Sequence, residues 1–263
     1  MRAPTTSLPP NPCADLTAYY RHGDSLRSRS VSTVVHSQRL QIAAPPPHIV
    51  ADWEREISGP PGLEPGDVEA LPLSRTRLRW PDLKLCVQAA IDWTQGLGLP
   101  GVLSTSDMAL MACRGARYHH DAAQYGSFVF CNLFLSEDQG LDLHFPALQL
   151  RIPLCRGEAV VFDTGQPHAV IARGGTAFDR ADFPPLRNCS QVFLTWEISL
   201  DHPTVAQDLG VVFDTETTTV ATLTEAQLWC HGAPAQLCPA TGAWAQPVDS
   251  SLHLTQAARL PEH

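Results

Sequence analysis

The stretch Tyr118-His119-His120-Asp121 places two candidate metal ligands, His119 and Asp121, two positions apart. Residues i and i+2 of a β-strand point to the same face of the sheet. If the run 109–121 is a strand, His119 and Asp121 therefore face one way and His120 faces the other. This spacing predicts a pair of ligands on one side of a β-structure.

A third candidate ligand, His168, lies farther along the chain in the run Gly165-Gln166-Pro167-His168. Two imidazoles and one carboxylate on one face of a metal ion form the facial triad of non-haem Fe(II) sites. Three protein ligands leave about three octahedral positions open, which suits a redox reaction with O2 and a co-substrate. The predicted metal site is His119, Asp121 and His168.

The sequence between and around these ligands favours short strands. Hydrophobic, β-branched and aromatic residues recur in runs that are separated by turn residues. Such spacing is typical of a sandwich or jelly roll. The predicted strands cover 127–135, 141–145, 148–154, 157–162 and 191–200.

Helices are expected mainly before residue 105. The spacing of Leu83, Val87, Ala90 and Ile91 predicts an amphipathic helix over 81–97 that covers one face of the β core. Further helices are expected at 15–20, at 49–57 and from Thr224 to near Gly232, and further strands at 31–35, 40–42, 211–213 and 217–222.

Composition limits the function classes. The chain has 263 residues and a net charge of −9, which argues against nucleic acid or an anionic membrane as a partner. No run of about 20 apolar residues is present, so no transmembrane helix is expected, and the predicted location is cytoplasmic. In a reducing compartment the eight cysteines are expected to be free thiols.

The order of these parts resembles the 2-oxoglutarate/Fe(II)-dependent dioxygenase superfamily, most closely its prolyl-hydroxylase-like branch. The resemblance covers roughly 106–200, and the pair Gly140-Leu141 stands where the family usually has two glycines. The matching parts are the segment ending in His-x-Asp at 114–121, the hydrophobic strand at 128–135, the strand after a Gly turn at 140–145, the Pro- and Gly-containing segment at 153–162, and His168.

The resemblance implies an α+β, mainly β fold with a double-stranded β-helix core, of the jelly-roll or cupin-like type, and flanking helices. It implies a catalytic core at 106–200 between an N-terminal extension with bracing helices at 1–105 and a C-terminal extension at 201–263 that packs on the core. It also implies Fe(II), 2-oxoglutarate and O2 as cofactors. The expected reaction hydroxylates an unactivated C–H bond and releases succinate and CO2.

The family holds the far carboxylate of 2-oxoglutarate with a basic residue after the distal histidine. Three arginines follow His168, and Arg187 is preferred over Arg173 and Arg180 because it directly precedes a strand, with Ser190 as a possible hydroxyl partner. Asn132 and Tyr125 are further candidate contacts to the co-substrate. Arg117 is expected to form either a structural ion pair or a substrate contact.

Two other function classes stay open from the sequence. One is a cupin-type metal enzyme that does not use 2-oxoglutarate, and the other is a non-enzymatic β-sandwich binding protein. Oxygen-dependent formation of succinate separates the oxygenase from both. A small-molecule substrate or an amino acid is favoured, a peptide or protein substrate remains open, and neither nucleic acid nor membrane is expected as a partner.

Overall fold

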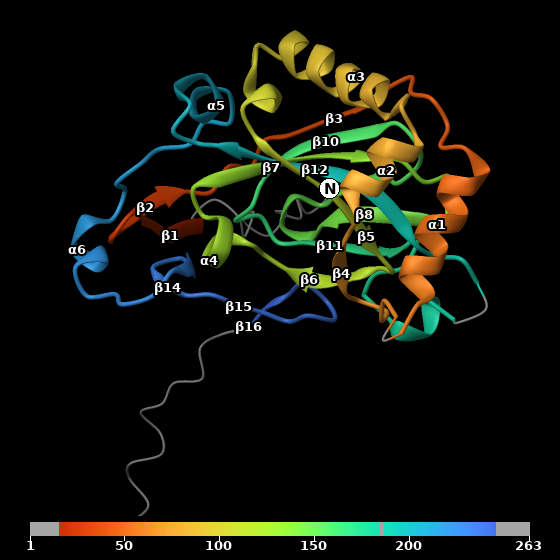
Figure 1. The fold of residues 1–263 in the computed structure, drawn as a ribbon. Helices are drawn as coiled ribbons and strands as arrows, with labels where there is room; N and C mark the ends of the chain where they lie inside the picture. Colours follow the sequence, from red (N-terminus) through yellow and green to blue (C-terminus); the bar gives the residue numbers. More distant parts are fainter. Residues whose placement is uncertain (1–15, 61, 185–186, 246–263) are drawn as a thin grey trace, which may run out of the picture.

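Two antiparallel sheets form the centre of the computed structural model, which describes residues 16–60, 62–184 and 187–245 (Figure 1). The larger sheet has the strand order β3 (Val35–Arg39), β10 (Glu158–Asp163), β7 (Phe128–Phe134), β12 (Gln191–Ser199), β5 (Asp107–Cys113) and β4 (Val68–Leu71). The smaller sheet has the order β6 (Ala116–His119), β11 (His168–Ala172), β8 (Leu141–Phe145) and β9 (Leu150–Pro153).

Between β5 and β12 the chain passes repeatedly from one sheet to the other. β5, β7, β10 and β12 belong to the larger sheet, and β6, β8, β9 and β11 belong to the smaller one. Every pairing within these two sheets is antiparallel. The chain is therefore mainly β with helices around the sheets, as the sequence predicted.

The two sheets share an aromatic-rich cluster of buried side chains. Phe134 and Phe162 come from the larger sheet, and Leu143, Phe145 and Val170 come from the smaller one. Because side chains alternate along a strand, these residues define the inner face of each sheet. This inner face is the surface from which an interior site has to be built.

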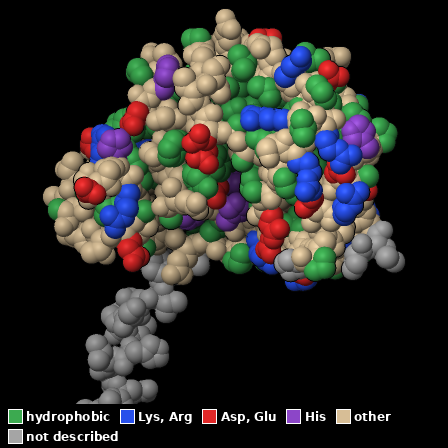
Figure 2. Space-filling model, viewed as in Figure 1, with side chains coloured by type: hydrophobic (Ala, Val, Ile, Leu, Met, Phe, Trp, Pro, Cys, Tyr) green, Lys and Arg blue, Asp and Glu red, His purple; other side chains and the backbone are tan. Residues whose placement is uncertain are grey.

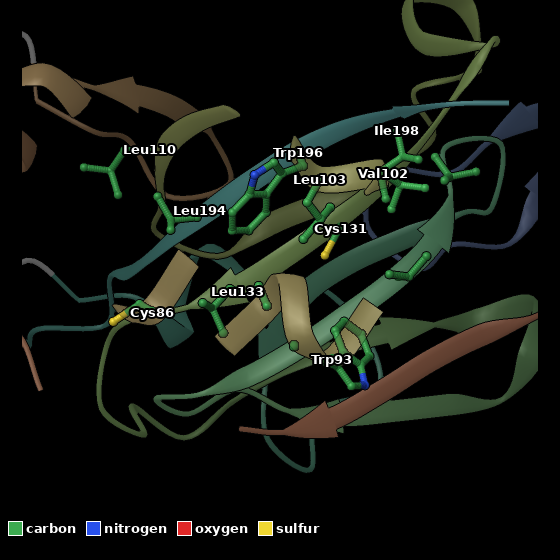
Figure 3. Packing of buried hydrophobic residues seen from close by; sticks show 14 of the residues in the cluster. Cys86, Trp93, Val102, Leu103, Leu110, Cys131, Leu133, Leu194, Trp196 and Ile198 are labelled. Atoms are coloured by element: carbon green, nitrogen blue, oxygen red, sulfur yellow. The ribbon is translucent and has the colours of Figure 1, made fainter. Parts of the chain in front are cut away.

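The outer face of the larger sheet is covered by helices, of which α3 (Leu83–Gly96) lies along the top in Figure 1. Figure 3 shows Cys86 and Trp93 of α3 in one buried cluster with Leu133, Leu194 and Trp196 of the sheet. The helices predicted at 81–97 and 49–57 are confirmed as α3 and α1 (Pro47–Ser58). The other helices are α2 (Leu73–Arg79), α4 (Ala122–Tyr125), α5 (Pro203–Asp208) and α6 (Thr217–Val220).

A third sheet joins segments from both ends of the described chain. Its order is β14 (Ala233–Pro234), β13 (Gln227–Cys230), β1 (Leu16–His22) and β2 (Ser25–Ser30), and a separate pair is formed by β15 (Gln236–Leu237) and β16 (Trp244–Ala245). Strand β1 packs against α4, the short helix that follows Asp121. The third sheet therefore lies directly beside the predicted metal ligands.

Several local predictions outside 106–200 are wrong. The helix predicted at 15–20 is strand β1 from Leu16 onward, the strand predicted at 217–222 contains helix α6, and the helix predicted after Thr224 is strand β13. Strands β1 and β13 pair with each other although they lie about two hundred positions apart in the sequence. A local sequence pattern does not indicate such a distant partner. The run 211–213 contributes only an isolated bridge from Phe213 to Arg29.

The predicted division at residues 105 and 200 remains a prediction, and parts of both extensions lie outside the described residues. Within the described part, β3 and β4 from the N-terminal segment are edge strands of the larger sheet. All cysteines in the described ranges are free thiols. No helix there is long and apolar enough to cross a bilayer.

Candidate metal centre

The three predicted ligands lie together at one end of the smaller sheet. His119 is the last residue of β6, and His168 is the first residue of β11 and its direct partner in the strand pairing. With Asp121 they form a group whose potential ligand atoms all lie within 4.8 Å of one another. The two imidazole ring centres are 4.3 Å apart.

Asp121 reaches this position differently from the way the sequence suggested. The run 109–121 is not one strand, because a turn at Gly115, with φ of 67°, separates β5 from β6. Asp121 lies just beyond β6, before the first residue of α4, and its backbone N–H donates to the carbonyl of Thr164 at 2.7 Å. The loop that precedes His168 therefore holds Asp121 in place.

Backbone carbonyls set the tautomers of both histidines. Nδ1 of His119 lies 2.7 Å from the carbonyl oxygen of Arg117, and Nδ1 of His168 lies 2.9 Å from that of Gln166. A carbonyl only accepts, so each Nδ1 carries the proton and each Nε2 keeps its lone pair. The Nε2 atoms lie 3.8 Å and 3.6 Å from the carboxylate oxygens of Asp121.

Burial makes the metal-free site unfavourable for charge. It raises the pKa of the Asp121 carboxyl, although nearby His119 and His120 act in the opposite direction. It lowers the pKa of His168 well below its usual range, so that this imidazole is neutral at neutral pH. A neutral imidazole and a carboxylate that lacks a cationic partner suit a divalent cation. The donor set therefore fits Fe(II).

His120 is outside this group. Its side chain contributes no ligand atom to the cluster, and its Nδ1 is buried without a hydrogen-bond partner. Burial also lowers its pKa. The expectation that it faces away from His119 stays a prediction.

Aromatic rings line the interior beside His168. Its ring centre lies 4.9 Å from that of Phe162 and 6.0 Å from that of Phe145. Phe130 is 6.0 Å from Phe162, and Tyr125 packs edge-on against Phe130 at 5.1 Å. These rings form an aromatic wall beside His168, and Tyr125 connects them to the helix that follows Asp121.

Two buried amides on the inner face of the larger sheet have an unpaired oxygen atom. Asn132 alternates with Phe130 and Phe134 on β7 and is 7% exposed, and its Oδ1 accepts no hydrogen bond. Gln191, fully buried at the start of β12, has an unpaired Oε1, whereas its Nε2 donates to the carbonyl of Glu137 at 3.3 Å. Asn132 was predicted from the sequence, whereas Gln191 was missed. Its alternation with Phe193 along the predicted strand is the signal that would have identified it.

The structure does not bring Arg187 and Ser190 to the ligand group. Arg187 is exposed and donates to the carbonyl of Gln139 at 3.2 Å, and the Ser190 N–H donates to Asn188 at 3.1 Å. Both residues line a surface pocket of about 810 Å³ beside α1. Their assignment to the co-substrate was based on chain order, and the long segment between β11 and β12 places them at this pocket instead.

The other two candidate arginines are held by carboxylates. Arg173 donates to Asp142 at 2.9 Å and to Asp138 at 2.8 Å and 3.0 Å. Arg180 forms an ion pair with Glu64. None of the arginine or lysine side chains in the described ranges forms a hydrogen bond or ion pair with His119, Asp121 or His168, and the cationic anchor for 2-oxoglutarate stays a prediction.

Arg117 forms the structural ion pair that was one of its two expected roles. Its guanidinium donates to Asp67 at 2.8 Å and lies 5.9 Å from the ring centre of Phe178. Figure 2 shows histidine side chains gathered in a hollow near the middle of the displayed face.

Comparisons with known proteins give a distant likeness in structure only. No protein-family model matches the chain, and no match is found among the curated proteins. The chain is similar to a prolyl-4-hydroxylase from Pseudomonas putida, with 19% identity, a TM-score of 0.35, and coverage of 63% of this chain and 92% of that chain.

Two further solved structures show the same kind of likeness. A viral collagen prolyl hydroxylase from Paramecium Bursaria Chlorella virus-1, in complex with 2-oxoglutarate, is 11% identical, with a TM-score of 0.35 and coverage of 63% of this chain and 94% of that chain. EvdO2 from Micromonospora carbonacea var. aurantiaca is 16% identical, with a TM-score of 0.33 and coverage of 53% and 69%. Because these scores are low, the proposed function rests on the side chains of this chain.

Proposed function

We propose that this chain is an Fe(II)- and 2-oxoglutarate-dependent oxygenase with a double-stranded β-helix core. One observation carries the proposal: the Nε2 atoms of His119 and His168 and the carboxylate of Asp121 converge within one ligand group, with both histidines oriented by backbone carbonyls. This is the facial donor set that leaves coordination positions open for O2 and a co-substrate. The strand exchange between the two sheets supports the β-helix core.

The residues of the chain hold the metal and shield it. His119, Asp121 and His168 would hold Fe(II), and the carbonyls of Arg117 and Gln166 keep the two imidazoles in the tautomer that can bind it. When bound, Fe(II) with O2 and 2-oxoglutarate supplies the oxidising power for hydroxylation of an unactivated C–H bond, with succinate and CO2 as co-products. The aromatic rings beside His168 exclude water from one side of the site.

A buried amide, that of Asn132, is the proposed contact for the far end of the co-substrate. An amide presents either its oxygen or its NH2 group after rotation, so Asn132 can donate to a carboxylate. We propose Asn132 for this role, with Tyr125 at the aromatic wall, since this amide is buried with an unpaired oxygen atom, whereas the NH2 group of Gln191 already donates to the carbonyl of Glu137. The substrate class favoured here is a small molecule or amino acid, with a peptide as the alternative.

The cupin-type alternative has one observation in its favour. The far carboxylate of 2-oxoglutarate would be costly to bury without a cation, and no arginine or lysine side chain of the described ranges bonds to the ligand group. A metal enzyme that does not take 2-oxoglutarate needs no such cation. The two functions therefore differ in whether 2-oxoglutarate binds to the metal-loaded protein.

Anaerobic titration of the Fe(II)-loaded protein with 2-oxoglutarate separates the two functions. The oxygenase predicts a weak visible charge-transfer band, followed after admission of air by one succinate per 2-oxoglutarate consumed. The same protein with His119→Ala serves as the control and should give neither signal. A fully iron-loaded protein that shows no band and forms no succinate would favour the cupin-type function.

A further inference from the structure

We propose that Arg29 and Asp163 are positioning residues of the metal centre, an inference that rests on the metal site proposed above. Arg29 lies on β2 of the third sheet, outside the two central sheets, and Asp163 ends β10. Their ion pair fixes the loop 163–168 and through it the positions of two metal ligands. The third sheet is thereby part of the metal site, although it contributes no ligand.

The ion pair is completely buried. The side chains of Arg29 and Asp163 are both 0% exposed, and they form two hydrogen bonds of 2.7 Å and 2.8 Å. The guanidinium also donates to the carbonyls of Gly126 at 2.5 Å and Ser30 at 3.0 Å. Two carboxylate bonds and two carbonyl bonds fix the planar guanidinium in one orientation.

The carboxylate of Asp163 accepts two further bonds from the backbone. The Ser32 N–H donates to Oδ2 at 2.8 Å, and the Gly165 N–H donates to Oδ1 at 2.7 Å. The side-chain amide of Gln166 donates to the carbonyl of Ser32 at 2.6 Å. The loop after β10 is therefore attached at several points to the segment that follows β2.

The same loop holds two of the three ligands. The carbonyl of Thr164 accepts the Asp121 N–H at 2.7 Å, and the carbonyl of Gln166 lies 2.9 Å from Nδ1 of His168. The Thr164 hydroxyl bonds to the carbonyls of Tyr125 and Phe128 at 2.8 Å and 2.9 Å. A displacement of this loop would move the carboxylate and one imidazole together.

Close packing leaves the loop little room to move. A Cβ at Gly165 would lie 2.7 Å from the side chain of Val31, and a Cβ at Gly126 would lie 2.2 Å from that of Tyr20. Both contacts come from the third sheet or the residue after it. Glycine at these two positions allows the sheet to approach the loop and the turn after α4.

A second arginine on the same strand provides a matched control. Arg27 also makes two bonds to a carboxylate, that of Asp214, but these side chains are 31% and 51% exposed, and neither bonds to a metal ligand or to the 163–168 loop. Buried ion pairs are often no more stabilising than apolar side chains of the same size. The role of the Arg29–Asp163 pair is therefore best tested through the geometry of the metal site.

The test compares Arg29→Met/Asp163→Asn, Arg29→Lys and Arg27→Met with the wild-type chain. Each full-length protein is titrated with Co(II), and its visible spectrum, its metal-free thermal unfolding and its amide hydrogen exchange at 163–168 are measured. The double variant removes both buried charges while keeping a side-chain oxygen for the loop. We expect its Co(II) affinity to fall by about 10- to 100-fold, the range for changes behind metal ligands, with an altered spectrum and faster exchange.

Arg27→Met should change the affinity by less than about twofold, because its ion pair is exposed. Arg29→Lys keeps the charge but loses the planar guanidinium, and it should weaken Co(II) binding. This variant provides the test if the double variant fails to fold. Unchanged affinity and spectrum in a folded Arg29 variant, or an equal loss in Arg27→Met, would overturn the positioning role. Absence of Co(II) binding by the wild-type chain would instead contradict the proposed metal site.

Discussion

At the metal centre, both histidine rings are oriented by backbone carbonyls and Asp121 is fixed by a backbone N–H, whereas Arg187 at the surface pocket beside α1 is exposed and makes one long hydrogen bond. The ligands lie on, or directly next to, paired strands. Arg187 and Ser190 follow the long connection between β11 and β12. The three ligands predicted at strand ends thus lie together, whereas the two residues that follow the long loop lie at the surface pocket.

The difference has a physical origin. A strand register specifies which residues are neighbours, and a shift by one residue exchanges the two faces. A long surface connection imposes no such periodicity, and its side chains are placed by contacts that are distant in sequence. The comparison therefore predicts large effects for changes at the ligand group and small effects for changes at Arg187.

The largest effect is expected for Asp121→Ala. Substitution of a residue that only hydrogen-bonds to a metal ligand already lowers metal affinity or activity by about 10- to 100-fold. Loss of the only carboxylate in the ligand group should exceed that range. We expect 2-oxoglutarate turnover to fall by more than about 100-fold, measured as succinate formed at saturating Fe(II). Turnover near the wild-type value would separate the ligand group from the chemistry.

Gly115→Ala tests the turn between β5 and β6, which contacts a residue of the surface pocket. Gly115 has φ of 67°, and a Cβ there would lie 2.4 Å from the ring of Phe183, which lines the surface pocket. Left-handed backbone costs an alanine about 1–2 kcal/mol, and displacement of the ring adds to that. We expect a loss of about 3 kcal/mol in the free energy of unfolding by urea. Gly98 also has a positive φ, but a Cβ there would meet no neighbouring atom. Gly98→Ala should therefore lose only the part of the free energy of unfolding that comes from the backbone conformation.

The stability of the metal-free protein should decrease as the pH falls below about 6.5. Burial lowers the pKa of His168 in the folded chain, so below its ordinary pKa the unfolded chain binds a proton that the folded chain does not. Each such group lowers the free energy of unfolding by up to about 1.4 kcal/mol per pH unit. The His168→Gln variant should show a shallower pH dependence in thermal unfolding, and an identical slope would contradict the burial of a neutral imidazole.

Arg187→Ala should have the smallest effect. Its guanidinium is exposed and has no carboxylate partner among the described residues, so its removal should change the 2-oxoglutarate requirement by less than about twofold. Asn132→Leu, which removes a buried amide, is the contrasting variant and should raise that requirement. A large effect of Arg187→Ala alone would return the co-substrate anchor to the surface pocket.

The sequence predicted the ligand group because strand periodicity and residue chemistry agree there. The His-x-Asp spacing and the later His168 were sufficient to identify the group, and the stripe of Leu83, Ala90 and neighbouring residues predicted α3. The continuity of the strand was not predicted correctly, because Gly115 turns the chain between β5 and β6.

The rest depended on contacts between distant parts of the chain. Arg29 lies in a segment without clear periodicity, and its partner Asp163 is more than a hundred positions away. Strand β1 pairs with β13 near the other end of the described chain, so neither strand had a local signal strong enough to predict it. Burial of an ion pair is a property of the folded chain and has no sequence pattern of its own.

Ferrous iron content per chain is the most direct test of the central claim that His119, Asp121 and His168 form one metal site. Wild-type protein and the His119→Ala and His120→Ala variants would be loaded with Fe(II) anaerobically, passed through a desalting column and analysed for iron. His119 contributes to the ligand group and the neighbouring His120 does not. We expect about one iron per chain in the wild type and in His120→Ala, and almost none in His119→Ala. Equal iron loss in the two variants, or full retention in both, would contradict the assignment.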